Sequence, residues 1–219
     1  MNRGPVVDAR VSRKAVWGGD VERLARLMAL LALTLLSASC GDVTRQGTGS
    51  AFLIINTLEA ASGADPTRFS GTLNSDVLTI VDDVPTIFND VGRVRLVLAM
   101  KDAGGVTTPT APTTNNFITL NRYRVRYIRS DGRNTAGVDV PYGFDGAFTG
   151  TVGTGEITVG FELVRHIAKK EAPLGALAGN GVIISTIAEV TFYGTDQTGH
   201  EVSVTGQLLV SFGNFGDPN

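Results

Sequence analysis

Apolar and polar residues alternate along several segments of this chain. The clearest examples are residues 182–193 and 201–212, where one face is mostly valine, isoleucine, leucine and phenylalanine. A period of two is typical of a β-strand with one buried face. Residues 194–200 between them contain two glycines, an aspartate and two threonines, and they predict a hairpin turn. The same reasoning predicts strands at residues 51–56, 76–80, 91–101, 116–129, 144–152 and 156–165.

Signals for helix are few and short. Asn56 and Glu59 have the spacing of a helix cap, and Gly63 follows where one or two helical turns would end. Residues 167–178 interrupt the strand pattern and predict an insertion with a helical turn, which Pro173 limits in length. The pattern as a whole predicts an all-β fold: an antiparallel β-sandwich of about seven or eight strands with one or two short helical turns.

The strand pattern over residues 50–213 resembles the immunoglobulin-like and fibronectin type III-like modules of bacterial envelopes. The resemblance rests on the spacing of strands and turns and implies two packed antiparallel sheets. The cysteine pair and core tryptophan of antibody domains are absent, because the single tryptophan, Trp17, precedes the single cysteine, Cys40.

Composition excludes several classes of protein. The 219 residues are 42% hydrophobic, and 19 Lys and Arg nearly balance 21 Asp and Glu, which gives a net charge of −2. This apolar content and low charge argue against a disordered chain. They also argue against a nucleic-acid partner, which would require a basic surface. One cysteine cannot build a disulfide scaffold.

The first 40 residues have the features of an export signal. Arg23 and Arg26 precede the apolar segment 27–36, and small residues lead to Cys40. A basic region, a short apolar region and small residues before a cleavage site define a secretory signal. The apolar segment is too short for a transmembrane helix, which needs about 20 residues.

Residues 36–40, Leu-Ser-Ala-Ser-Cys, resemble the lipobox of bacterial lipoproteins. The resemblance implies lipidation of the Cys40 thiol, cleavage before this residue and acylation of the new amino group. Ser37 departs from the leucine that the family usually has. Translation is expected to start near Val21, because the residues before it are unusual for a signal.

The lipobox resemblance divides the chain into three parts and gives it a location. It implies that residues 1–39 are the signal peptide and residues 40–50 a lipidated linker, and residues 51–219 are expected to form a single β-sandwich domain. Acylated Cys40 would hold the protein in the membrane of the cell envelope. Gly41, in place of an aspartate, implies the outer membrane if the source is Gram-negative.

The sequence offers little catalytic chemistry. The two histidines, His166 and His200, fall at a strand end and in a hairpin turn, and no nucleophile motif accompanies either one. Several acidic residues could still form a pair of catalytic carboxylates in the folded protein. The simpler interpretation is that they are solvated residues of turns and sheet faces. These acids are Asp82, Asp83, Asp139, Asp145, Glu162 and Glu189. We therefore expect that the protein is not an enzyme and that it has no catalytic residues and no cofactor.

Two turns contain enough oxygen ligands to raise the idea of calcium. Residues 196–201 and residues 130–134 each combine an aspartate with a glycine and further polar side chains. Both lack the additional acids of a calcium loop, so ordinary turns are favoured and no metal site is predicted.

The strand at 116–129 carries a candidate interaction face. Arg122, Arg124 and Arg126 alternate with apolar and aromatic residues, so they share one face of the sheet. They could bind an anionic polymer. Alternatively, they pair across strands with acids such as Glu162 or Glu189, and this interpretation is favoured.

Residues 104–115 are rich in threonine and proline and predict an exposed loop. Loops on a rigid sandwich often carry binding, although this one can equally be a tolerated insertion.

These patterns lead to one principal functional hypothesis and two alternatives. The principal hypothesis is an envelope-anchored lipoprotein whose non-catalytic β-sandwich is a structural, adaptor or protein-interaction module. Its partners would be the membrane, through Cys40, and another envelope protein. The second hypothesis is a module that binds a glycan, a lipid or calcium, and the third is an enzyme of unknown type.

Overall fold

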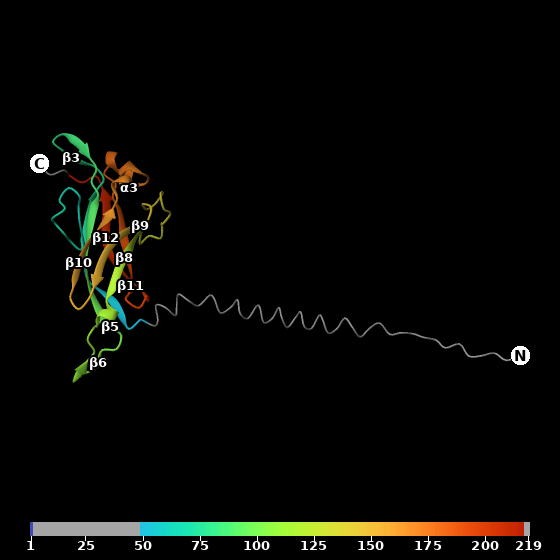
Figure 1. Cartoon of the computed structure of the whole chain (residues 1–219). Coiled ribbons are helices and arrows are strands. Elements are labelled where there is room, and N and C mark those ends of the chain that lie inside the picture. Colours follow the sequence, from blue (N-terminus) through green and yellow to red (C-terminus); the bar gives the residue numbers. More distant parts are fainter. Residues whose placement is uncertain (2–48, 217–219) are drawn as a thin grey trace. The chain divides into compact units, whose positions relative to one another are not determined.

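The computed structural model describes Met1 and residues 49–216 of the chain (Figure 1). The rest of the predicted signal peptide, Cys40 and the linker up to residue 48 lie outside the described residues. The described part is predominantly β, and its eight longest strands form two sheets that pack as a sandwich, while β3-β4 and β6-β7 are separate two-stranded pairs. The prediction of a predominantly β protein whose sheets pack as a sandwich is therefore confirmed.

The larger sheet has five strands in the order β2-β12-β11-β8-β9. The smaller sheet has three strands in the order β1-β5-β10. Neighbouring strands are antiparallel, except that β2 runs parallel to β12. The strands are β1 (Ala51–Ala61), β2 (Thr72–Asp76), β5 (Asp90–Met100), β8 (Ile118–Ile128), β9 (Phe144–Val152), β10 (Ile157–Val164), β11 (Ile184–Asp196) and β12 (Glu201–Gly213).

Aromatic rings join the two sheets at the centre of the core. Phe161 on β10 packs against Phe192 on β11 and Tyr123 on β8, with ring centroids 5.3 and 5.2 Å apart. Such edge-on and tilted contacts suit the charge distribution of aromatic rings. The alternation read from the sequence holds in these strands, since the side chains on the opposite face of β8 and β11 point outward. Burial of the apolar face is the main force that holds the sheets together.

The N-terminal strand differs from its prediction. We expected one or two helical turns between Asn56 and Gly63, but β1 continues as a strand to Ala61. β5 pairs with β1 along this whole segment, and Glu59 lies opposite Arg93 with an ion pair of 2.8 Å. A break in the register next to Asn56 absorbs one residue. Cross-strand pairing thus overrides the local helix signal.

Shorter elements occupy the two ends of the sandwich. Figure 1 shows β3 and α3 at one end and β6 at the other. The predicted insertion at residues 167–178 indeed contains helical turns, α3 and η2. The threonine- and proline-rich loop is exposed as expected and contains two very short strands and one helical turn. These elements are β3 (Thr79–Val81), β4 (Val84–Thr86), β6 (Gly104–Gly105), β7 (Thr108–Pro109), η1 (Thr114–Asn116), α3 (His166–Lys170) and η2 (Leu174–Gly179).

Candidate functional site

One edge of β8 is left without a partner strand near its C-terminal end. β9 pairs with β8 only as far as Val125, which lies opposite Phe144. On the other side β11 accompanies β8 to Ile128. We call the space beside β8 that lies beyond Phe144, the first residue of β9, the β8 notch. Its lining residues are Arg124, Val125, Arg126, Tyr127, Ile128, Asn134, Ala136, Val140, Pro141, Gly143, Phe144 and Asp145.

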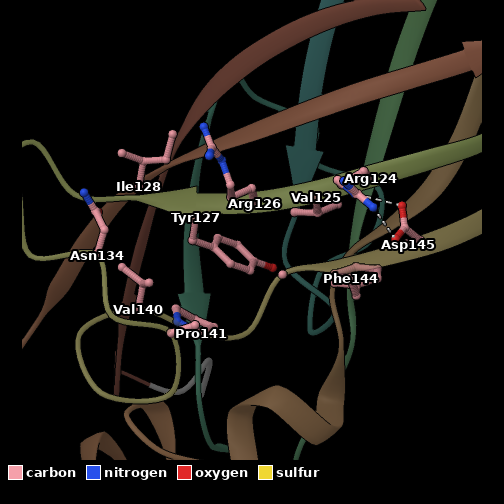
Figure 2. Close-up of a pocket in the computed structure, with 12 residues that line it drawn as sticks. Arg124, Val125, Arg126, Tyr127, Ile128, Asn134, Val140, Pro141, Phe144 and Asp145 are labelled. Atoms are coloured by element: carbon pink, nitrogen blue, oxygen red, sulfur yellow. Dashed lines mark hydrogen bonds and ion pairs between the residues drawn. The ribbon is translucent and has the colours of Figure 1, made fainter. Parts of the chain in front are cut away.

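The β8 notch is a cavity of about 470 Å³. Its floor is apolar, because Val125, Tyr127 and Val140 are buried hydrophobic residues. In Figure 2 the ring of Tyr127 lies between β8 and the loop that carries Val140 and Pro141, whereas Arg126 points to the opposite side of the strand. Ligand sites usually have volumes of about 300–1,000 Å³ and mainly apolar walls with a few polar groups, so the notch has suitable dimensions.

The loop of residues 129–143 is held against β8 and forms one wall of the notch. At its start the backbone N–H of Arg129 donates a 2.7 Å hydrogen bond to Asn134 Oδ1. Gly137 has a φ of 77°, which favours glycine, and its N–H donates to the carbonyl oxygen of Val140 at 2.8 Å. At the end of the loop Gly143 is so close to β8 that an added Cβ would lie 2.8 Å from the Val125 carbonyl oxygen.

The arginine stripe predicted on β8 lies next to the notch, and two of its members, Arg124 and Arg126, are among the lining residues. Arg122, Arg124 and Arg126 all project from the outer face of the five-stranded sheet and are exposed. Arg124 makes two 3.0 Å hydrogen bonds to Asp145, and Arg122 reaches the same carboxylate at 3.2 Å. Arg126 pairs with Glu189 at 2.9 Å. Cross-strand pairing with Glu189 was expected, and Asp145 is a partner that sequence reasoning did not pair with these arginines.

These ion pairs leave the stripe less basic than its sequence suggests. The hydrogen bond from Arg124 holds the pKa of the Asp145 carboxyl below its usual value, and the same bond raises the pKa of Arg124. Arg122 also lies over the ring of Tyr193, 4.0 Å from its centroid. Glu162, the other expected partner, lies on β10 of the opposite sheet, and no ion pair joins it to the stripe within residues 49–216.

The predicted turn at residues 130–134 uses its acid to hold arginines. Asp131 Oδ2 accepts hydrogen bonds from Arg129 and Arg133 at 2.7 and 2.8 Å. The bond from Arg129, followed by that from Arg133, lowers the pKa of Asp131 far below its usual value. Its oxygens are thus occupied by guanidinium groups, which supports the interpretation of an ordinary turn.

The hairpin between β11 and β12 uses its aspartate in the same local way. Asp196 Oδ1 accepts hydrogen bonds from the backbone N–H of Thr198 and of His200, both at 2.9 Å. His200 Nδ1 lies 3.1 Å from Asp196 Oδ2. Burial opposes ionisation of this carboxyl, but the hydrogen bonds from Thr198 and His200 outweigh it and lower the pKa of Asp196. The oxygen atoms that suggested calcium therefore organise the hairpin turn.

The remaining predicted residues are not gathered into one site. His166 begins α3 and contacts Asn89, with Nδ1 3.0 Å from Oδ1. Asp82 and Asp83 form the turn between β3 and β4, and Asp139 accepts a hydrogen bond from the Thr135 N–H. Among the residues that the structure describes, no group of three or more metal-ligating side chains is found.

A buried ionic cluster lies elsewhere in the sandwich, and sequence reasoning missed it. Asp90, the first residue of β5, is 0% exposed, and Lys169 on α3 is 2% exposed. Lys169 Nζ lies 2.9 Å from each oxygen of the Asp90 carboxyl group. Ser75 donates to Oδ2 at 2.5 Å and the Gly63 N–H to Oδ1 at 2.9 Å.

Nothing in the local sequence indicated this buried ion pair. Lys169 precedes a second lysine, Lys170, in a segment that reads as a surface insertion, and Asp90 looks like any acid at a strand end. Burial raises the pKa of Asp90, although Lys169 and Ser75 favour its charged form. Only the fold brings the two side chains together, across 79 positions of sequence.

No known protein family, curated protein or solved structure matches this chain. None of the helices within the described residues combines the length and the apolar character that are needed to cross a membrane. The site must therefore be interpreted from its own geometry.

Proposed function

We propose that this chain is a bacterial envelope lipoprotein whose β-sandwich is a non-catalytic interaction module, and that it holds an extended segment of another envelope protein in the β8 notch. The observation that carries this proposal is that β9 begins only at Phe144, which leaves the edge of β8 beyond Val125 open above an apolar floor. An open edge and an apolar surface are the features expected of an adaptor.

The backbone of β8 supports an extended ligand. Successive residues of a strand direct their peptide groups to opposite sides. Val125 faces Phe144, and the Arg129 N–H faces Asn134 in the loop. Tyr127, midway between these two residues, accordingly directs its own N–H and C=O into the notch. A peptide aligned with β8 would bond to these groups and place a side chain over the apolar floor.

The topology supports the finer assignment to an immunoglobulin-like sandwich. In the immunoglobulin fold, strands G, F and C are neighbours in one sheet, variable domains add C′ beside C, and A, B and E lie in the other sheet. The order β12-β11-β8-β9 matches G-F-C-C′, and β1-β5-β10 matches A-B-E. Loops and edges of this architecture commonly carry binding, so the position of the notch fits the proposed role.

The membrane anchor rests on the lipobox resemblance at Cys40. Its test is the intact mass and detergent partitioning of the native protein beside a Cys40→Ala form. Loss of residues 1–39 together with added acyl mass, and a shift of the Cys40→Ala form into the aqueous phase, are the expected results. A native protein that stays aqueous and unacylated would contradict the anchor without affecting the notch.

The notch is tested by site-specific crosslinking in cells. A photoreactive amino acid at Ala136, which lines the notch, is compared with the same amino acid at Ala111 in the exposed threonine- and proline-rich loop. The expected result is one crosslinked partner from position 136, joined through residues of an extended segment, and none from position 111. Equal crosslinking from both positions, or joining through a helix, would overturn the proposed binding mode.

A small apolar ligand is the second candidate, because the cavity has a buried floor and a charged rim at Arg124 and Asp145. Native mass spectrometry of the protein purified from its own membrane separates the two candidates. A bound small molecule that is lost on replacement of Ala136 by tryptophan would favour the ligand module. Its absence together with a notch-specific crosslink favours the adaptor.

A further inference from the structure

We propose that Lys169 and Asp90 become joined by an amide bond between the lysine Nζ and the aspartate Cγ, an internal crosslink that ties α3 to β5. The two side chains come from different parts of the sandwich and meet in its interior, at 1% and 0% side-chain exposure. This proposal concerns the stability of the domain and is independent of the proposed function.

The geometry places the reacting atoms within range of each other. Lys169 Nζ is 2.9 Å from both Asp90 Oδ1 and Asp90 Oδ2. Given ordinary carbon–oxygen bond lengths, a nitrogen in that position is at most about 3.3 Å from the carbon that bears the oxygens. Reactive pairs held at about 3–3.5 Å gain most of the advantage of intramolecular reaction.

Burial favours the neutral acid at Asp90. A charge that is removed from water loses its hydration, which disfavours the ionised form. Desolvation accordingly raises the pKa of Asp90, which favours the carboxylic acid over the carboxylate. Transfer of a proton from the ammonium group to the carboxylate gives an amine and an acid in contact. Formation of the amide then removes both ionisable groups from the interior.

The remaining contacts of Asp90 suit the two oxygens for different roles. The Gly63 N–H donates to Oδ1 and would stabilise the negative charge that develops there in the tetrahedral intermediate. The Ser75 hydroxyl donates to Oδ2 and would pass a proton to this oxygen as it leaves. Ser75 is itself 0% exposed, so bulk water does not compete for either position.

The reaction is balanced without any further reactant. The nitrogen lone pair of Lys169 attacks Asp90 Cγ, and the new C–N bond forms. The C–Oδ2 bond then breaks, and Oδ2 departs as water with the proton of the acid and one proton from the nitrogen. Ser75 gives one proton and regains one, so it is unchanged. No atom is oxidised or reduced.

Peptide mapping of the native protein tests the crosslink directly. Trypsin releases residues 69–93, which contain Asp90, and can cut after Lys169 only when its side chain is free. The expected product is residues 69–93 joined to residues 166–170, with a mass lower than the sum of the two peptides by one water. Fragmentation must place the junction at Asp90 and Lys169, because water loss within residues 69–93 alone would be a cyclic imide of the aspartate.

A matched pair of variants completes the test. Lys169→Arg keeps the positive charge but cannot form this amide, so the joined peptide should disappear. Lys170→Arg changes the exposed neighbouring lysine and should retain the joined peptide. Recovery of linear residues 69–93 and cleavage after Lys169 in the folded native protein would overturn the proposal, whatever the stability of either variant.

Discussion

Tyr127 on β8 donates a 2.7 Å hydrogen bond to the carbonyl oxygen of Leu163 on β10 and thereby connects the two sheets. The tyrosine is 3% exposed, and Leu163 is 0% exposed. Burial strongly raises the pKa of Tyr127, so the hydroxyl remains a donor under any ordinary condition. The ring also packs edge-on against Phe212, with centroids 5.5 Å apart. The same residue thus supports the floor of the β8 notch and the contact between sheets.

Replacement of Tyr127 by phenylalanine is expected to destabilise the domain by about 1–3 kcal/mol. The Leu163 carbonyl group would lose its side-chain donor in a dry environment, which costs about 1–3 kcal/mol for a buried polar group. Denaturant unfolding measures the difference. Tyr142→Phe is the control, because Tyr142 is 53% exposed and should tolerate the change. Equal stability of the two variants would show that the hydrogen bond contributes nothing.

Gly92→Ala is expected to destabilise the core by about 1–3 kcal/mol, the usual cost of overpacking. Gly92 lies opposite Phe161 in the pairing of β5 with β10, and a Cβ at this position would overlap the phenylalanine ring. Phe161 cannot move freely because it packs against Phe192. Thermal unfolding should separate this variant from Gly155→Ala, where a Cβ meets nothing within 4 Å. A Gly92→Ala protein as stable as Gly155→Ala would contradict the packing.

Asp196 in the hairpin between β11 and β12 should make the stability of the folded domain depend on pH in the acidic range. Hydrogen bonds lower the pKa of Asp196 below its ordinary value of 3.8, so its charged form stabilises the folded state above that pH. This contribution is lost as the pH falls from about 4 through the lowered pKa. Asp196→Asn should therefore cost about 1–2 kcal/mol near neutral pH and progressively less in acid. Asp102→Asn in the exposed loop serves as control, and parallel pH profiles for wild type and Asp196→Asn would refute the assignment.

Asp145→Asn should expose the positive charge of the arginine stripe. Arg122 and Arg124 both depend on this carboxylate, so its neutralisation leaves their guanidinium groups available to anions. The variant is expected to elute from a heparin column at higher salt than the wild type. The unpaired guanidinium groups attract the anionic heparin, and more salt is then needed to screen this attraction. Asp83→Asn, in the turn between β3 and β4, changes the net charge equally. Identical elution of the two variants would mean that net charge alone determines retention.

The sequence by itself determined most of the strands and their faces. Residues 144–152 were predicted as a strand and form β9 with those bounds. The outward position of the three arginines on β8 also followed from alternation alone. Both properties are local, because a period of two fixes which side chains can share a buried face. The lipidation of Cys40 is also a sequence-based prediction, which awaits its mass measurement.

Tertiary structure alone decided which strands pair and where a partner is missing. Three features depend on cross-strand contacts between distant segments: the extension of β1 past Asn56, the parallel pairing of β2 with β12 and the start of β9 at Phe144. The pair formed by Asp90 and Lys169 is the extreme case, because each residue looks like a surface charge in its own segment. Hydrophobic burial is non-directional, so the pattern of apolar residues specifies the class of fold, a sandwich, but not the particular pairs of residues that meet. The particular contacts arise only from the register and packing of the completed fold.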